Sequence, residues 1–282
     1  MSFLAIIIAL VLVQVWGSGG RVQRDEWFIT WQARVSGLSA IPLLRLSLQV
    51  LLPAVLCWLV LDVVGGFLFG LLWLILAVVL LLYSFGRGEF FSVMERYRGQ
   101  CRSGDFEGAY LTARAELAWI SEADDPVSAA EVHALVQREF VYEGYQRWFA
   151  VLFYFVLLGP PGAVAYRLLQ LSCRGEDGRL ALTSLFYVDW LPARLVAAAF
   201  TLTGDFAGSR DAFLASLRNT GDSARGVLYT VAEAALDSSL DLFAGDDRAF
   251  AAEAARNSEQ LAGLLSRSAA CWVLVLAVFV LF

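Results

Sequence analysis

Runs of apolar residues that carry almost no charge alternate along this chain with polar segments that hold most of its ionisable side chains. The mean hydropathy is +0.64 and only 17% of the residues are charged, which is far more apolar than a soluble domain of 282 residues. A lipid bilayer is therefore the solvent that this pattern indicates, and helices satisfy the backbone polar groups there. We expect an all-α, polytopic helical membrane protein with amphipathic cytoplasmic helices.

Six apolar segments are predicted, and they cover residues 3–16, 47–62, 67–85, 148–171, 191–204 and 269–282. Together with the polar helical segments 86–146 and 205–267 they form one integral membrane domain over residues 1–282. No basic residue or small-residue cleavage motif accompanies the first segment, which favours an uncleaved span over a signal peptide. The fifth segment is of marginal length, so it either spans the bilayer, lies at the interface or re-enters.

Two of the apolar segments contain turn or break signals. Asp62-Val-Val-Gly65-Gly66 interrupts the run from 47 to 85, which predicts two antiparallel helices joined by a tight turn. Beside that turn, Asp62 fits a solvated interfacial carboxylate better than a buried proton carrier. Gly159-Pro160-Pro161-Gly162 lies near the middle of the fourth segment, and its prolines remove backbone donors. A break or kink is predicted there.

The polar segments keep the spacing of amphipathic helices. One helix is predicted to start at Asp105, because Phe106, Tyr110, Ala113, Leu117 and Ile120 recur at steps of four and three. Another is predicted after Asp124-Asp125-Pro126, with Val132, Leu135, Val136 and Phe140 on one side. A stripe of Leu228, Val231, Ala235 and Leu242 indicates a third helix. Finally, Asp246-Asp247 predicts the start of a long helix that runs directly into the last apolar segment.

Composition excludes several kinds of chemistry. Every basic residue is Arg, so the chain has neither the lysine of a phosphate-binding loop nor a Schiff-base lysine. The four cysteines, Cys57, Cys101, Cys173 and Cys271, are far apart and predict reduced, structural thiols rather than disulfides or a metal site. A net charge of −6 argues against binding to nucleic acid.

The single imidazole, His133, lies between Glu131 and Arg138 in a predicted helix without an obvious partner. We expect a surface or packing role for it rather than catalysis. Arginines concentrate in residues 21–45, 86–147 and 205–267, which fall on one side of the membrane if six spans alternate. The positive-inside rule places that side in the cytoplasm and both termini outside.

The constellation with chemical promise lies around the fourth and fifth apolar segments. Tyr166-Arg167 closes one of them, and Asp189-Trp190 and Arg194 open the next, so a short connection should hold two guanidiniums and a carboxylate near one membrane face. Two arginines placed in this way could grip a phosphate or carboxylate in fork geometry. Alternatively, both arginines snorkel, Asp189 and Pro192 start a helix and Trp190 belongs to the interfacial belt.

The stretch from Gly159 to Arg167, followed by Asp189-Trp-Leu-Pro-Ala-Arg-Leu195, resembles the paired signatures of the CobD/CbiB membrane family. With the hairpin at 47–85, the helix from Asp105 and the apolar ends, the resemblance extends along essentially the whole chain. Within that family, length and loop pattern are most similar to the AmpE branch, inner-membrane signalling modulators associated with β-lactamase induction.

This resemblance implies a multi-pass protein of the bacterial inner membrane that acts in signal transduction and the antibiotic response. It places an anionic ligand, such as a muropeptide or a phosphate-containing molecule, at Tyr166, Arg167, Asp189, Trp190 and Arg194. The expected partners are the lipid bilayer, that ligand, and other proteins or a second copy of the chain, with no nucleic acid. No cofactor or metal is expected.

The enzymatic branch of the same family uses ATP to form an amide bond in cobalamin synthesis. Its D-x-L-x-G-D-P motif corresponds here to Val15-Trp-Gly-Ser-Gly-Gly20, and its N-T-L-D-S-M motif to Leu168-Leu-Gln-Leu-Ser-Cys173. Because these acidic groups are missing, cobalamin synthesis is disfavoured. A related membrane ligase or transferase that uses ATP and Mg²⁺ is the alternative, and it requires a re-entrant fifth segment or an inverted orientation. A small transporter, suggested by the glycine-proline break, is the second alternative.

Overall fold

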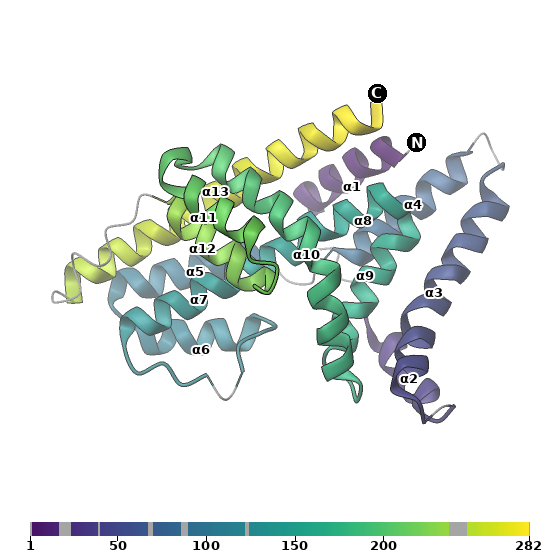
Figure 1. The fold of residues 1–282 in the computed structure, drawn as a ribbon, viewed down its shortest axis with the longest axis horizontal. Helices are drawn as coiled ribbons and strands as arrows, with labels where there is room; N and C mark the ends of the chain where they lie inside the picture. The colour runs from purple at the N-terminus through teal and green to yellow at the C-terminus, as the bar shows by residue number, and fades with distance from the viewer. Residues whose placement is uncertain are drawn as a thin grey trace. The chain divides into compact units, whose positions relative to one another are not determined.

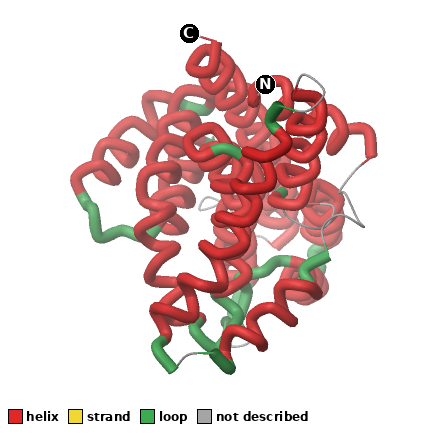
Figure 2. Tube along the Cα trace, turned by 90° about the vertical axis from the view of Figure 1, so that its right-hand side faces the viewer, coloured by secondary structure: helices red, strands yellow, loops and turns green. Residues whose placement is uncertain are grey.

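The computed structural model describes residues 2–16, 24–38, 40–66, 70–85, 90–121, 124–236 and 247–281 (Figure 1). Over these ranges the chain consists of helices joined by loops and turns, without a β-strand (Figure 2). The predicted all-α class is therefore confirmed. Contacts divide the chain into two compact units, which we call unit 1 (residues 1–88, 147–189 and 275–282) and unit 2 (residues 89–146 and 190–274).

Unit 1 is built around a helix that three others surround. Its complete helices are α1 (Ser2–Trp16), α2 (Glu26–Ser36), α3 (Pro42–Val64), α4 (Leu71–Ser84), α8 (Ala150–Leu158) and α9 (Pro160–Ser172). The central helix α9 packs against α3, α4 and α8. At the periphery, α1 packs against α4, and α2 packs against α3. This arrangement brings the sequence-predicted residues of α9 into the interior of the unit.

Unit 2 contains the polar segments. Its complete helices are α5 (Phe90–Ser103), α6 (Phe106–Glu116), α7 (Ala129–Gly144), α11 (Phe206–Arg218) and α12 (Ala224–Ala235). Neighbours in space are α5 with α6, α6 with α7, α7 with α12, and α12 with α11. Three further elements have residues in both units, namely the π-helical turn η2 (Tyr145–Phe149), α10 (Gly178–Thr203) and α13 (Asp247–Leu281).

Three helices of the described chain are long and apolar enough to cross a bilayer. They cover Pro42–Val64, Gly178–Thr203 and Asp247–Val278, whereas the apolar helices Ser2–Val15 and Leu71–Ser84 are shorter. On α3, large apolar side chains such as Trp58, 56% exposed, lie on the outside of the protein, where lipid suits them better than water. The chain is thus an all-α helical membrane protein. That it crosses the membrane six times stays a prediction.

The predicted break in the fourth apolar segment is confirmed. Helix α8 ends at Leu158 and α9 begins at Pro160, so neither its 9 nor its 13 residues reach across a bilayer. Between them Gly159 adopts φ 75° and ψ −169°, a backbone region that is essentially restricted to glycine. The two prolines then occupy the first turn of α9, where no helical donor is needed.

The predicted boundaries of the fifth segment are wrong. Helix α10 starts at Gly178 and runs for 26 residues, so most of the predicted link between 171 and 191 is helical. Ala181 and Leu185 are already buried in this part of the helix, and packing therefore extends it well ahead of the apolar run. Asp189 and Pro192 consequently lie inside a helix and do not start one.

The polar segments follow the predicted periodicity with two shifted ends. Helix α6 begins directly after Asp105, as predicted. The Asp105 carboxylate accepts a hydrogen bond from the Gly108 amide at 2.9 Å. It ends at Glu116, however, so the predicted continuation through Ile120 is wrong. Helix α7 begins at Ala129, because the Ser128 hydroxyl provides the cap that was expected near Pro126.

The long C-terminal helix is confirmed, since α13 begins at Asp247 and continues to Leu281. In α12, the stripe residues Leu228, Val231 and Ala235 are buried as expected, while Leu242 and Asp246 lie outside the described residues. All four cysteines are free, as predicted.

Candidate functional site

In unit 1, Tyr166 and Asp189 form a buried hydrogen bond. The Tyr166 hydroxyl of α9 donates to Asp189 Oδ1 at 2.7 Å, and both side chains are almost fully buried. The Tyr154 ring stacks on Tyr166 with centroids 5.3 Å apart, and its hydroxyl donates to the Val188 carbonyl at 2.8 Å. Together these bonds fix Asp189 against α9. The carboxylate is therefore held by a phenol, a contact that the sequence did not predict.

The next residue of α9, Arg167, pairs with Asp25. Its Nη2 lies 3.3 Å from Asp25 Oδ2, and Nη1 donates to Gln170 Oε1 at 3.4 Å. Both members of the ion pair are largely shielded from solvent. Asp25 also directly precedes α2, and its carbonyl accepts a hydrogen bond from the Phe28 amide at 2.9 Å. Arg167 thus links the central helix to the first turn of α2.

A second ion pair supports the same unit. The Arg45 guanidinium at the start of α3 donates to both Asp177 oxygens, at 2.6 and 3.0 Å, immediately before α10 begins. Such a fork is the strongest geometry for an arginine and a carboxylate. This pair explains why the polar stretch near Asp177 folds into the turn ahead of α10.

Arg194 lies in unit 2 and binds the backbone. Its Nε donates to the Ser216 carbonyl, Nη2 to the Asn219 carbonyl and Nη1 to the Trp190 carbonyl, at 3.0, 3.0 and 3.1 Å. The side chain is only 2% exposed, and its guanidinium carbon lies 4.2 Å from the centre of the Trp190 ring. Two of these carbonyls are at the C-terminal end of α11, where a cation is favourable. Arg194 therefore caps α11.

His133 is not on the surface. It is 3% exposed, with Nδ1 at 3.0 Å from the Tyr97 hydroxyl and Nε2 at 3.1 Å from Asn257 Oδ1. The amide oxygen assigns the proton to Nε2, so Tyr97 donates to Nδ1. Burial lowers the pKa of His133 to about 4, although the bond to Asn257 opposes this effect. The packing role is supported, whereas the expected lack of partners is wrong.

Helix α7 also contains a buried carboxylate, Glu139, that was not predicted from the sequence. Glu139 Oε1 lies 3.3 Å from both Arg138 Nε and Arg225 Nη1, and the Arg225 guanidinium lies over the Tyr142 ring. Burial raises the pKa of Glu139, and the two arginines act in the opposite direction. Across the described ranges no group of three or more His, Cys, Asp or Glu side chains forms a metal-binding cluster.

The predicted site residues thus divide between the two units. Tyr166, Arg167 and Asp189 belong to unit 1, while Trp190 and Arg194 belong to unit 2. Convergence of the two guanidiniums on one anion stays a prediction. Gln170 was not among the predicted site residues. Its contact with Arg167 could have been predicted, because the two residues are three positions apart on one helix. Asp25 had only the weak signal of an acid ahead of an amphipathic helix.

Comparison with known proteins matches most of the chain to a family model. The family model described as regulatory signalling modulator protein AmpE matches residues 1–249. Searches of curated proteins and of solved structures find no match. The matched region includes the hairpin, the glycine-proline break, Tyr166-Arg167 and the helix that holds Asp189 and Arg194, while a relation to the CobD/CbiB proteins stays a prediction. The chain therefore belongs to the AmpE family of regulatory signalling modulators.

Proposed function

We propose that this protein is a multi-pass modulator in the bacterial inner membrane that binds an anionic ligand and is linked to β-lactamase induction and the response to cell-wall stress. Family membership supports the regulatory role, and the three long apolar helices support the membrane location. The link to β-lactamase and the nature of the ligand are the new parts of the proposal.

The Arg167–Asp25 pair is the observation that carries the ligand proposal. Charged groups placed among apolar helices are costly, and in membrane proteins they commonly mark functional sites. A guanidinium matches the geometry of a carboxylate or phosphate. In this structure Arg167 pairs with the Asp25 carboxylate at 3.3 Å, and a phosphate or a muropeptide carboxylate would compete for the same donors.

Such competition provides a route for a signal. Asp25 directly precedes α2, so an anion that replaces it on Arg167 frees the first turn of α2 from α9. A ligand shifts this equilibrium only by its preference for the open state over the paired state. The pair therefore acts as a latch between α9 and α2, which the ligand opens.

β-Lactamase induction in cells tests this proposal, with Arg167→Gln and Asp25→Asn expressed at the wild-type level in the membrane. We expect Arg167→Gln to abolish modulation because the anion loses its fork. Asp25→Asn should lower the inducer concentration at half-maximal response, because the guanidinium no longer has a competing carboxylate. Arg179→Gln is the matched control, since Arg179 is an exposed arginine of the same unit. Unchanged induction in the Arg167→Gln cells would show that this residue does not bind the signal.

A further inference from the structure

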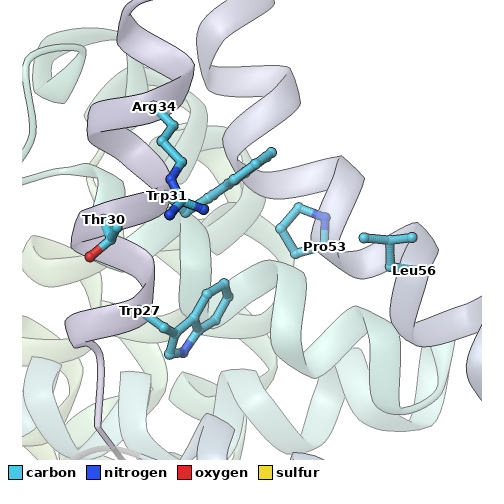
Figure 3. A pocket seen from close by; sticks show the side chains of 6 residues that line it. All are labelled: Trp27, Thr30, Trp31, Arg34, Pro53 and Leu56. Atoms are coloured by element: carbon cyan, nitrogen blue, oxygen red, sulfur yellow. The ribbon is translucent and has the colours of Figure 1, made fainter.

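A groove lies between α2 and α3 in unit 1. Its volume is about 410 Å³, which is large enough for part of a lipid molecule. Figure 3 shows the residues of α2 on one side and those of α3 on the other. The groove is lined by Trp27, Thr30, Trp31, Arg34, Pro53 and Leu56. Apolar side chains form most of its surface, and a single cation lies among them.

Two of the polar groups that line this groove have no hydrogen-bond partner in the described structure. Arg34 is exposed and makes no hydrogen bond or ion pair in the described structure. The indole N–H of Trp31 is buried and has no acceptor. A buried donor without an acceptor is costly, and an unpaired guanidinium attracts anionic oxygen. The Trp31 indole N–H and the Arg34 guanidinium are therefore two donors, one helical turn apart on α2, for which the described protein supplies no acceptor.

The surroundings of the groove indicate what occupies it. Helix α3 is a candidate membrane span, and Leu56, which lines the groove, is 53% exposed. The groove thus opens on a surface that is apolar enough to face lipid tails. Tryptophan and arginine side chains are typical of the level of the lipid headgroups. A lipid with its acyl chain against Pro53, Leu56 and Trp27 would bring its phosphate to the height of Arg34.

We propose that this groove is a binding site for one anionic phospholipid of the surrounding bilayer. The acyl chain lies between α2 and α3, and the phosphate accepts hydrogen bonds from Arg34. An anionic headgroup is preferred over a zwitterionic one, because the latter places an ammonium group near an unpaired guanidinium. This site shares no residue with the Arg167–Asp25 pair, so each proposal can fail without the other.

Quenching of tryptophan fluorescence by brominated lipid tests the proposal. The full-length protein is reconstituted in phosphatidylcholine vesicles that contain increasing fractions of phosphatidylglycerol brominated on its acyl chains, or of brominated phosphatidylcholine. The contribution of the groove is the difference between wild type and Trp27→Phe/Trp31→Phe. We expect the groove tryptophans to be quenched at several-fold lower fractions of phosphatidylglycerol than of phosphatidylcholine. Trp58, isolated in the same way with Trp58→Phe, lies on the open face of α3 and should show no such preference.

Two further variants separate a site from a general charge effect. Arg34→Gln should weaken the preference for phosphatidylglycerol about fivefold, the effect of one arginine near a membrane surface. Arg24→Gln removes the same charge from an exposed residue that does not line the groove, so the preference for phosphatidylglycerol should be preserved. Leu56→Trp, which fills the groove from an exposed position, should abolish the preference. Equal quenching by both lipids, or equal effects of Arg24→Gln and Arg34→Gln, would overturn the proposal.

Discussion

Arg194 was predicted to bind a ligand, but in the folded protein its guanidinium binds backbone carbonyls instead. Its guanidinium donates to three backbone carbonyls from a position that is almost fully buried. Arg194→Ala leaves these acceptors unsatisfied, and we expect it to lower the free energy of unfolding by about 3 kcal/mol. Arg194→Lys should also destabilise, because an ammonium cannot reproduce the planar fork. Thermal unfolding in detergent measures both effects.

The matched control for Arg194 is Arg210→Ala. Arg210 is an exposed residue of α11 in the same unit, so its loss should change stability by no more than about 0.5 kcal/mol. If Arg194→Ala melts like wild type, the capping role is wrong, and the guanidinium becomes available for the ligand-binding role that its sequence context suggests.

His133 gives a prediction for pH dependence. The imidazole has a pKa of about 4 in the folded protein and an ordinary pKa of 6.5 in the unfolded chain. Above pH 6.5 both forms are neutral, and stability is complete. As the pH falls from 6.5 to 4, the unfolded chain binds a proton that the folded protein excludes, so about 3 kcal/mol of stability is lost. Below pH 4 this contribution changes no further.

The measurement is the difference in stability between wild type and His133→Gln at pH 7.5 and at pH 5. Glutamine has no titrating group, so the variant should lose less stability over this interval than wild type does. Because all other ionisable groups are shared, their contributions cancel in the difference. Identical pH profiles would contradict the assignment of a buried neutral imidazole.

At the scale of the element, the break between α8 and α9 depends on one glycine. Gly159 has φ 75°, so a side chain at this position is strained whatever space surrounds it. We expect Gly159→Ala to cost about 1–3 kcal/mol of stability, measured by thermal unfolding in detergent. Gly99→Ala is the control, since Gly99 lies within α5 and its added Cβ would contact nothing within 4 Å. This second change should stabilise by about 0.5–1 kcal/mol. Equal effects would show that the backbone at Gly159 is not special.

Elements whose ends depend on local chemistry were predictable. The cap at Asp105 acts on an amide three residues away, and α13 begins at Asp247, the acidic position that was predicted to start it. The start of α10 was missed, because the bidentate pair of Arg45 and Asp177 joins residues 132 positions apart. A stretch of one or two helical turns of sequence contains the information for a local cap. It does not contain the information for an ion pair between residues far apart in the chain.

At the scale of the whole molecule, the arginine distribution predicts which segments face the cytoplasm. With six alternating spans, the polar segment 86–146 lies inside and the connection near Arg179 lies outside. Ser103→Cys should therefore react with a membrane-impermeant maleimide in inverted vesicles, and Arg179→Cys in spheroplasts. Both positions are exposed in the structure, and the wild-type chain provides the background from its own cysteines. Labelling of both from one side would contradict the six-span arrangement.

The sequence by itself determined the helical class, the membrane as solvent, the break at Gly159 and the family, because each follows from composition or from residues that are close along the chain. Only the tertiary structure decided the partners of the charged residues. Arg167 meets Asp25 across 142 residues, His133 meets Asn257 across 124, and Arg194 binds carbonyls of the next helix. The hydrophobic effect that drives helices together has no direction, so it does not specify which polar groups meet. Those pairings follow from how the helices pack, and they distinguish an arginine that caps a helix from one that pairs with a carboxylate.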